Sequence, residues 1–141
     1  MAGTLMMKIT HVVAGALAVG TIMAGLVKLA PQFSSTSYAQ QVHAFDIYYH
    51  PQWAFLGLSS DRLRSAVGIA ECVSGLASLA KRTRLVSYLV MTAIYAGAVR
   101  THLVLGDNGW HPAAGFLLAS CFCLGQTVRV VPVSAQSDKR A

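Results

Sequence analysis

Residues 9–30 read ITHVVAGALAVGTIMAGLVKLA, and this stretch decides the fold class. A helix needs about 20 apolar residues to cross the hydrocarbon core of a bilayer, which is the length of this block. It ends at Pro31, a residue that cannot continue a helix. Because only closed backbone hydrogen bonding is stable in lipid, the block predicts a transmembrane helix. Three further apolar blocks of comparable length follow, at residues 63–80, 85–105 and 112–133.

The composition favours a membrane protein over a soluble one. Apolar residues make up 55% of the 141 residues and charged residues 11%, whereas about a quarter of an average soluble domain is charged. A soluble domain of this size needs more charge on its surface. We therefore predict an all-α fold, an integral membrane four-helix bundle that forms one domain over residues 1–133, followed by a polar C-terminal tail at residues 134–141.

The basic residues, which give a net charge of +6, predict the orientation of the chain. With four spans, both termini share one side of the membrane with the turn between the second and third blocks. Basic residues gather on that side, so the positive-inside rule places both termini in the cytosol or its equivalent. The mitochondrial inner membrane and the endoplasmic reticulum are the expected locations. Nucleic-acid binding is not expected, because no aromatic platform for bases accompanies these residues. The basic residues expected on the side of the termini are Lys8, Lys81, Arg82, Arg84, Arg129, Lys139 and Arg140.

The long connection between the first two blocks, residues 32–62, predicts a short interfacial helix. Tyr48, Tyr49, Trp53 and Phe55 cluster in it. Amphipathic rings favour the headgroup level of a bilayer, so these aromatic residues are expected to anchor the helix there. A surface for docking a partner is the alternative.

Four ionisable residues fall at membrane depth: Lys28, Glu71, Arg100 and His102. A charged group at the centre of a bilayer costs about 2.5–3.5 kcal/mol unless it is paired. Their positions along the helices predict a polar cluster in which Arg100 bridges an ionised Glu71, with Lys28 or His102 nearby. We favour a structural role that fixes the helix register. The alternative is a polar pocket for a lipid headgroup, a quinone or a segment of a partner.

Small residues recur at every fourth position of each block and predict where helices pack closely. In the first block these are Ala16, Gly20 and Ala24. The second block has such a series at Ala70, Ser74 and Ser78.

The sequence contains no pattern that predicts catalysis or a bound metal. The histidines do not form a pair at one depth on two helices, as a bis-histidine haem requires. A phosphate-binding loop, a nucleophile–base pair and a zinc-ligand spacing are also missing from the sequence. We predict no catalytic residue, no metal site and no cofactor apart from a lipid or quinone, and no enzymatic activity of the chain on its own.

Three short motifs resemble those of the DoxX-like membrane proteins, especially the branch that includes the novel acetylcholine receptor chaperone. They are GLVKLAP at residues 25–31, RSAVGIAE at residues 64–71 and AVRTHLVLGD at residues 98–107. The resemblance covers roughly residues 14–131. It implies a four-helix bundle in which Glu71 is central. This chain differs from the receptor chaperone in its short tail.

These observations predict a non-catalytic membrane protein that binds other integral membrane proteins, as an accessory subunit of a larger complex or as an assembly or chaperone factor. Membrane lipids are the other expected partners. The alternative is a quinone- or lipid-binding subunit of a redox membrane complex, since some DoxX-like proteins resemble subunits of quinone-reducing thiosulfate oxidation systems. A small transporter is a third interpretation, disfavoured because the sequence has no visible inverted repeat.

Overall fold

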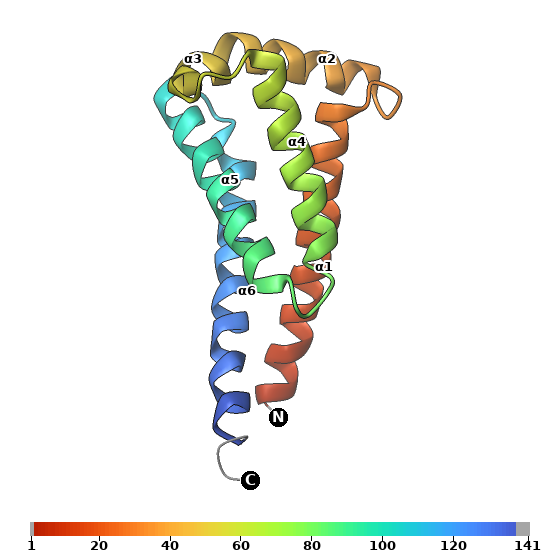
Figure 1. Ribbon diagram of the computed structural model, residues 1–141, viewed down its shortest axis with the longest axis vertical. Coiled ribbons are helices and arrows are strands. Elements are labelled where there is room, and N and C mark those ends of the chain that lie inside the picture. Colours follow the sequence, from red (N-terminus) through yellow and green to blue (C-terminus); the bar gives the residue numbers. More distant parts are fainter. Residues whose placement is uncertain (1, 138–141) are drawn as a thin grey trace.

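The computed structural model describes residues 2–137, and all secondary structure in that part of the chain is helical. The predicted all-α class is therefore confirmed. Four long helices lie side by side, and the two termini lie at the same end of them (Figure 1). The last helix reaches Ser137, beyond the predicted boundary at residue 133, and the rest of the predicted tail lies outside the described residues. The helices are α1 (Ala2–Leu29), α4 (Ser60–Ala77), α5 (Arg84–Leu105) and α6 (Trp110–Ser137).

Residues 35–56 form a cap that lies across the bundle at the end opposite the termini (Figure 1). The cap contains a π-helical turn just before Pro51, whose ring cannot follow a regular α-helical turn without a clash. It occupies the position of the predicted interfacial helix. The segments of the cap are α2 (Ser35–Ala44), η1 (Phe45–Tyr49), α3 (His50–Trp53) and η2 (Ala54–Leu56).

Local sequence signals set the ends of the helices that position the cap. The Ser34 hydroxyl accepts a hydrogen bond of 3.2 Å from the Ser37 backbone N–H and begins α2. Ser59 caps α4 in the same way through the Arg62 N–H. Gly106 ends α5 with a φ of 68°, a left-handed conformation that glycine adopts without steric cost.

The interior of the bundle is unusually polar and its exterior apolar. Thr21, Thr101 and Ser120 are fully buried, whereas Val12 and Leu118 are more than 70% exposed. The Thr21 hydroxyl lies 2.8 Å from the Tyr95 hydroxyl, a hydrogen bond between α1 and α5. Hydrogen-bonded hydroxyls between helices and apolar side chains facing outward are typical of helices in lipid.

Two of the four predicted spans are long and apolar enough to cross a membrane, namely residues 4–29 and 84–105. Length and composition alone also admit the core helix of a soluble protein. Core helices, however, are mostly buried, and in each of these spans only 22% of the most apolar window is buried. Among the described residues, α4 and α6 do not meet the same criteria.

The helices pack as two pairs. The contact of α1 with α4 and that of α5 with α6 are more extensive than the contacts between the pairs. Glycine produces the close approach of the first pair, since a Cβ added at Gly25 would lie 2.6 Å from the Gly68 carbonyl oxygen. The predicted series on α1 was Ala16, Gly20 and Ala24, so the residue that contacts α4 lies one position beyond it. Gly20 instead faces Phe116 of α6.

We predict that Gly25→Ala destabilises the bundle by about 1–3 kcal/mol, because the added methyl forces α1 away from α4. Gly15→Ala is the matched control, since a Cβ there meets nothing within 4 Å. Thermal unfolding of both variants in mild detergent measures the difference. Equal stability of the two variants would contradict the close packing.

Candidate functional site

A cavity of about 460 Å³ lies between the four long helices and the cap. This volume is within the range of known small-molecule sites. Its walls are mostly apolar, and a few polar groups reach it from α1, α4, α5 and the cap. The apolar side chains include Phe45, Leu56, Leu63, Val67, Ile94 and Phe116, and the polar ones include Lys28, Gln41, Tyr49, Glu71, Tyr95 and His102.

Lys28 and Glu71 form an ion pair at the edge of this cavity. The Lys28 Nζ lies 2.8 Å from Glu71 Oε2 and 3.1 Å from Oε1, and it also donates to the Ala24 carbonyl oxygen. The Glu71 side chain is 4% exposed and that of Lys28 12%. A buried ion pair is tolerated when the two charges are close and their hydrogen bonds are made.

The predicted bridge between Arg100 and Glu71 is wrong. Arg100 is exposed, and its guanidinium carbon lies 5.4 Å from the centre of the Trp53 ring. Glu71 is bonded to Lys28 instead. Sequence depth alone placed all three residues at a similar level, but the direction in which each points depends on the rotation of its helix, which the sequence left open.

Arg64 holds the end of α1 and was not among the predicted site residues. Its Nη1 donates to the Lys28 carbonyl oxygen, and its Nη2 lies 3.0 Å from Asp61 Oδ1. The guanidinium also lies over the Tyr38 ring of the cap. Arg64 therefore fixes the backbone of Lys28. The signal available in the sequence was its position inside the apolar block at residues 63–80, since an arginine there needs partners.

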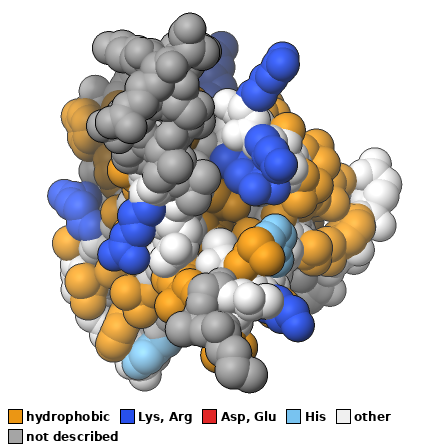
Figure 2. All heavy atoms as spheres, turned by 90° about the horizontal axis from the view of Figure 1, so that it is seen from below, with side chains coloured by type: hydrophobic (Ala, Val, Ile, Leu, Met, Phe, Trp, Pro, Cys, Tyr) orange, Lys and Arg blue, Asp and Glu red, His pale blue; other side chains and the backbone are white. Residues whose placement is uncertain are grey.

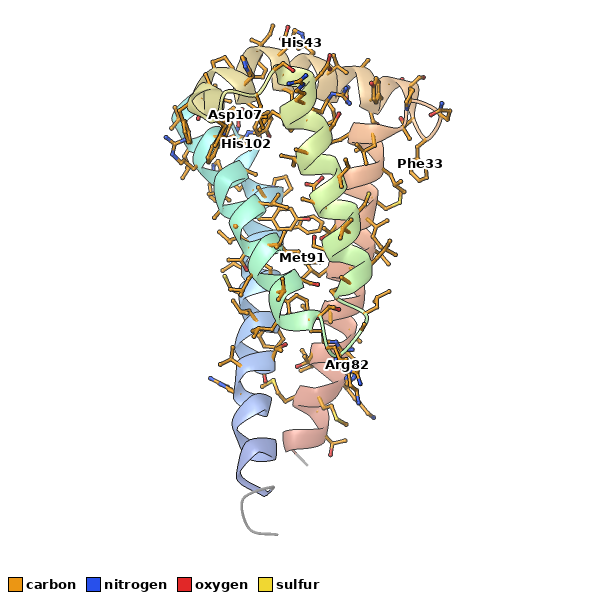
Figure 3. The ribbon with its side chains drawn as sticks, in the orientation of Figure 1. Phe33, His43, Arg82, Met91, His102 and Asp107 are labelled. Atoms are coloured by element: carbon orange, nitrogen blue, oxygen red, sulfur yellow. The ribbon has the colours of Figure 1, made fainter. Side chains whose placement is uncertain are left out.

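His102 connects the cavity to the surface through two hydrogen bonds. Its Nδ1 lies 2.8 Å from Asp107 Oδ1, and its Nε2 lies 2.9 Å from the Tyr49 hydroxyl. Asp107 is nearly half exposed, whereas His102 and Tyr49 line the cavity. Figure 3 shows His102 and Asp107 together at the capped end of the bundle. The result is a chain of carboxylate, imidazole and phenol.

Glycine makes room for this chain. A Cβ added at Gly109 would lie 2.5 Å from the His102 ring, so only glycine permits this approach of the loop. The Gly109 backbone N–H also donates to Asp107 Oδ1 at 2.8 Å and orients the carboxylate. Within the histidine–leucine–x–x–glycine–aspartate pattern at residues 102–107, His102 and Asp107 bond to each other and Gly106 ends α5.

The four predicted anchor residues of the cap divide into two groups. Tyr48 and Phe55 are exposed, at 43% and 74%. Tyr49 and Trp53 instead face the bundle, where the Trp53 Nε1–H donates to the Thr101 hydroxyl at 3.2 Å. These two side chains therefore belong to the site rather than to the outer surface. The π-helical turn at Phe45–Tyr49 places Tyr49 on the inner face.

Within the described residues, no group of three or more His, Cys, Asp or Glu side chains could hold a metal ion. No protein-family model matches the sequence, and no curated protein is significantly similar to it. The DoxX-like relationship, the role of accessory subunit or assembly factor, and the expected lack of enzymatic activity therefore stay predictions.

We predict that Glu71→Gln and Lys28→Met each destabilise the protein by about 3–5 kcal/mol, because each leaves one charge buried without its partner. The double variant Lys28→Met with Glu71→Leu recovers part of that loss. Arg100→Gln is the control and costs less than about 1 kcal/mol, the usual value of an exposed cation–π contact. Denaturant unfolding in detergent micelles measures all four. A loss of stability with Arg100→Gln as large as that with Glu71→Gln would instead support the predicted bridge between Arg100 and Glu71.

Burial raises the pKa of Tyr49 from 10.0 to about 12, and the nearby carboxylates of Asp107 and Glu71 contribute further. Between these two pH values the unfolded chain loses the phenol proton while the folded protein keeps it, so stability falls as the pH rises. We predict that Tyr49→Phe removes this part of the alkaline loss. Unfolding midpoints measured from pH 9 to pH 12 test it, and parallel curves for both proteins would contradict it.

Proposed function

We propose that this is an integral membrane protein whose four long helices cross the bilayer and which binds an amphiphilic membrane molecule, a quinone or a lipid, in the cavity beneath the cap. The single observation that carries the proposal is the cavity itself. It combines apolar walls with a small set of hydrogen-bonding groups, as sites for membrane-soluble molecules require. This function was the alternative in the sequence analysis.

The distribution of apolar and charged side chains supports the membrane part of the proposal. Large apolar side chains cover the outside of α1, α4, α5 and α6. The end with the termini carries basic side chains, and no acidic side chain is visible on the described part of that face (Figure 2). Three of the four described acidic residues lie at the capped end: Asp46 in the cap, Asp61 in the first turn of α4 and Asp107 in the connection after α5. This partition agrees with the positive-inside rule and supports both termini on the cytosolic side or its equivalent.

The charge of the site supports a neutral headgroup. Lys28 and Glu71 neutralise each other, and their polar atoms are used in mutual hydrogen bonds. Bringing a charged ligand beside them would bury a further charge without a counterion. A ligand with an apolar body and a hydroxyl or carbonyl head avoids this cost. Quinones, quinols and diacylglycerols share that chemistry.

The hydrogen-bond chain gives the headgroup a defined partner. When His102 is neutral and donates from Nδ1 to Asp107, its Nε2 can only accept, so the Tyr49 hydroxyl donates to it. The Tyr49 oxygen then offers an acceptor to the cavity and favours a hydroxyl head. When His102 is doubly protonated, Nε2 donates to Tyr49, and the phenol proton is free for a carbonyl. A neutral His102 therefore suits a ligand with a hydroxyl head, and a doubly protonated His102 suits one with a carbonyl head.

We predict that the purified protein binds decylubiquinol or dioleoylglycerol and that Ala98→Leu weakens this binding at least tenfold. The added side chain occupies part of the cavity that Ala98 lines. Ala96→Leu is the control, because Ala96 is exposed on the same helix and does not line the cavity. Equilibrium binding in detergent measures the affinities, and mass spectrometry of an extract identifies what copurifies.

The two probes distinguish the sources of the headgroup. Binding of the quinol alone indicates a redox lipid, and binding of the glycerolipid alone indicates a structural lipid. Binding of neither probe, or equal loss with Ala96→Leu and Ala98→Leu, would contradict the proposed site.

A further inference from the structure

A second hollow lies between α4 and α5, on the half of the bundle nearer the termini. It is a groove of about 430 Å³. Its walls are aliphatic, with Ala70, Val73 and Ala77 from α4 and Val86 and Val90 from α5. The groove lies at the contact of α5 with α4, which is less extensive than the contact of α5 with α6.

The hydroxyl groups of the groove are already used. Ser74 donates to the Glu71 carbonyl oxygen at 3.2 Å, and Ser87 donates to the Thr83 carbonyl oxygen at 2.9 Å. The Ser74 bond lies within α4, and the Ser87 bond joins α5 to Thr83, the residue that precedes it. The groove therefore offers no free hydroxyl from these two residues to a ligand, and its long wall is suited to a hydrocarbon chain.

Cations lie at the end of the groove. Arg82 lines it, and the neighbouring Lys81 is exposed on the same turn. Figure 3 shows Arg82 at the turn between α4 and α5. Arg84 has a different role, because its Nε donates to the Ser78 carbonyl oxygen at 3.1 Å and completes the end of α4. Among the described residues, no ion pair involves Lys81 or Arg82.

We propose that this groove is a binding site for an anionic phospholipid, with one acyl chain between α4 and α5 and the phosphate against Lys81 and Arg82. Charge complementarity selects this occupant over a helix of a second copy, since an apolar helix would leave both cations without a partner. Arginine and lysine beside a bilayer are attracted to anionic headgroups by about 1 kcal/mol each. The inference rests on the membrane-embedded part of the proposed function and does not depend on the ligand of the cavity.

The test uses the full-length protein in mild detergent, titrated with phosphatidylglycerol and followed by native mass spectrometry. The expected result is a saturable adduct that phosphatidylcholine does not form. Arg82→Gln is expected to weaken the adduct about fivefold, and the double change with Lys81→Gln about 25-fold. Arg62→Gln is the matched control, because Arg62 is exposed near the cap, away from the groove. Equal affinity for both lipids, or equal losses with Arg82→Gln and Arg62→Gln, would overturn the proposal.

A second measurement locates the acyl chain. Phosphatidylglycerol that carries a photoreactive diazirine in its chain is expected to label residues of the groove in α4 and α5. Labelling confined to other helices, or a cross-linked dimer in place of a lipid adduct, would overturn the assignment. Decylubiquinol binding is measured on the same sample to test the cavity separately. If phosphatidylglycerol does not bind the groove but the quinol still binds, the proposed function stands and only this inference fails.

Discussion

The ion pair of Lys28 and Glu71 is the constraint on which the arrangement of the helices depends. In a medium of low dielectric neither charge is stable alone, so α1 and α4 must bring the two side chains together. Gly25 and Gly68 allow the backbones to approach closely enough, and Arg64 then fixes the carbonyl group of Lys28. Small residues, ionic attraction and a backbone clamp act at the same contact, so a change in any one affects the other two.

The fold was more predictable from the sequence than the site was. Block lengths and Pro31 indicated helices, because these features depend on local properties of the chain. The partner of Glu71 was predicted incorrectly, since the choice between Lys28 and Arg100 depends on helix rotation. Tyr49 was expected among the interfacial anchors at the headgroup level. Its inward direction depends on the π-helical turn before Pro51, and hydrophobic periodicity does not reveal a turn of that kind.

Two polar systems at the cavity differ in their exposure to water. The ion pair is enclosed and internally neutral, which favours a permanent structural role. The chain from Asp107 through His102 to Tyr49 begins at the surface, where the Asp107 side chain is 45% exposed. The first system joins α1 to α4, and the second joins the cap to α5. Sequence depth alone grouped His102 with Lys28, Glu71 and Arg100 in one cluster.

The unequal packing of the helices gives the bundle a direction of deformation. Both members of the ion pair belong to the α1–α4 pair, whereas the cavity lies between that pair and α5–α6. At the capped end, Tyr49 and Trp53 tie the cap to α5 through His102 and Thr101. A tilt that separates the two pairs at the other end would therefore leave the buried charges of Lys28 and Glu71 paired.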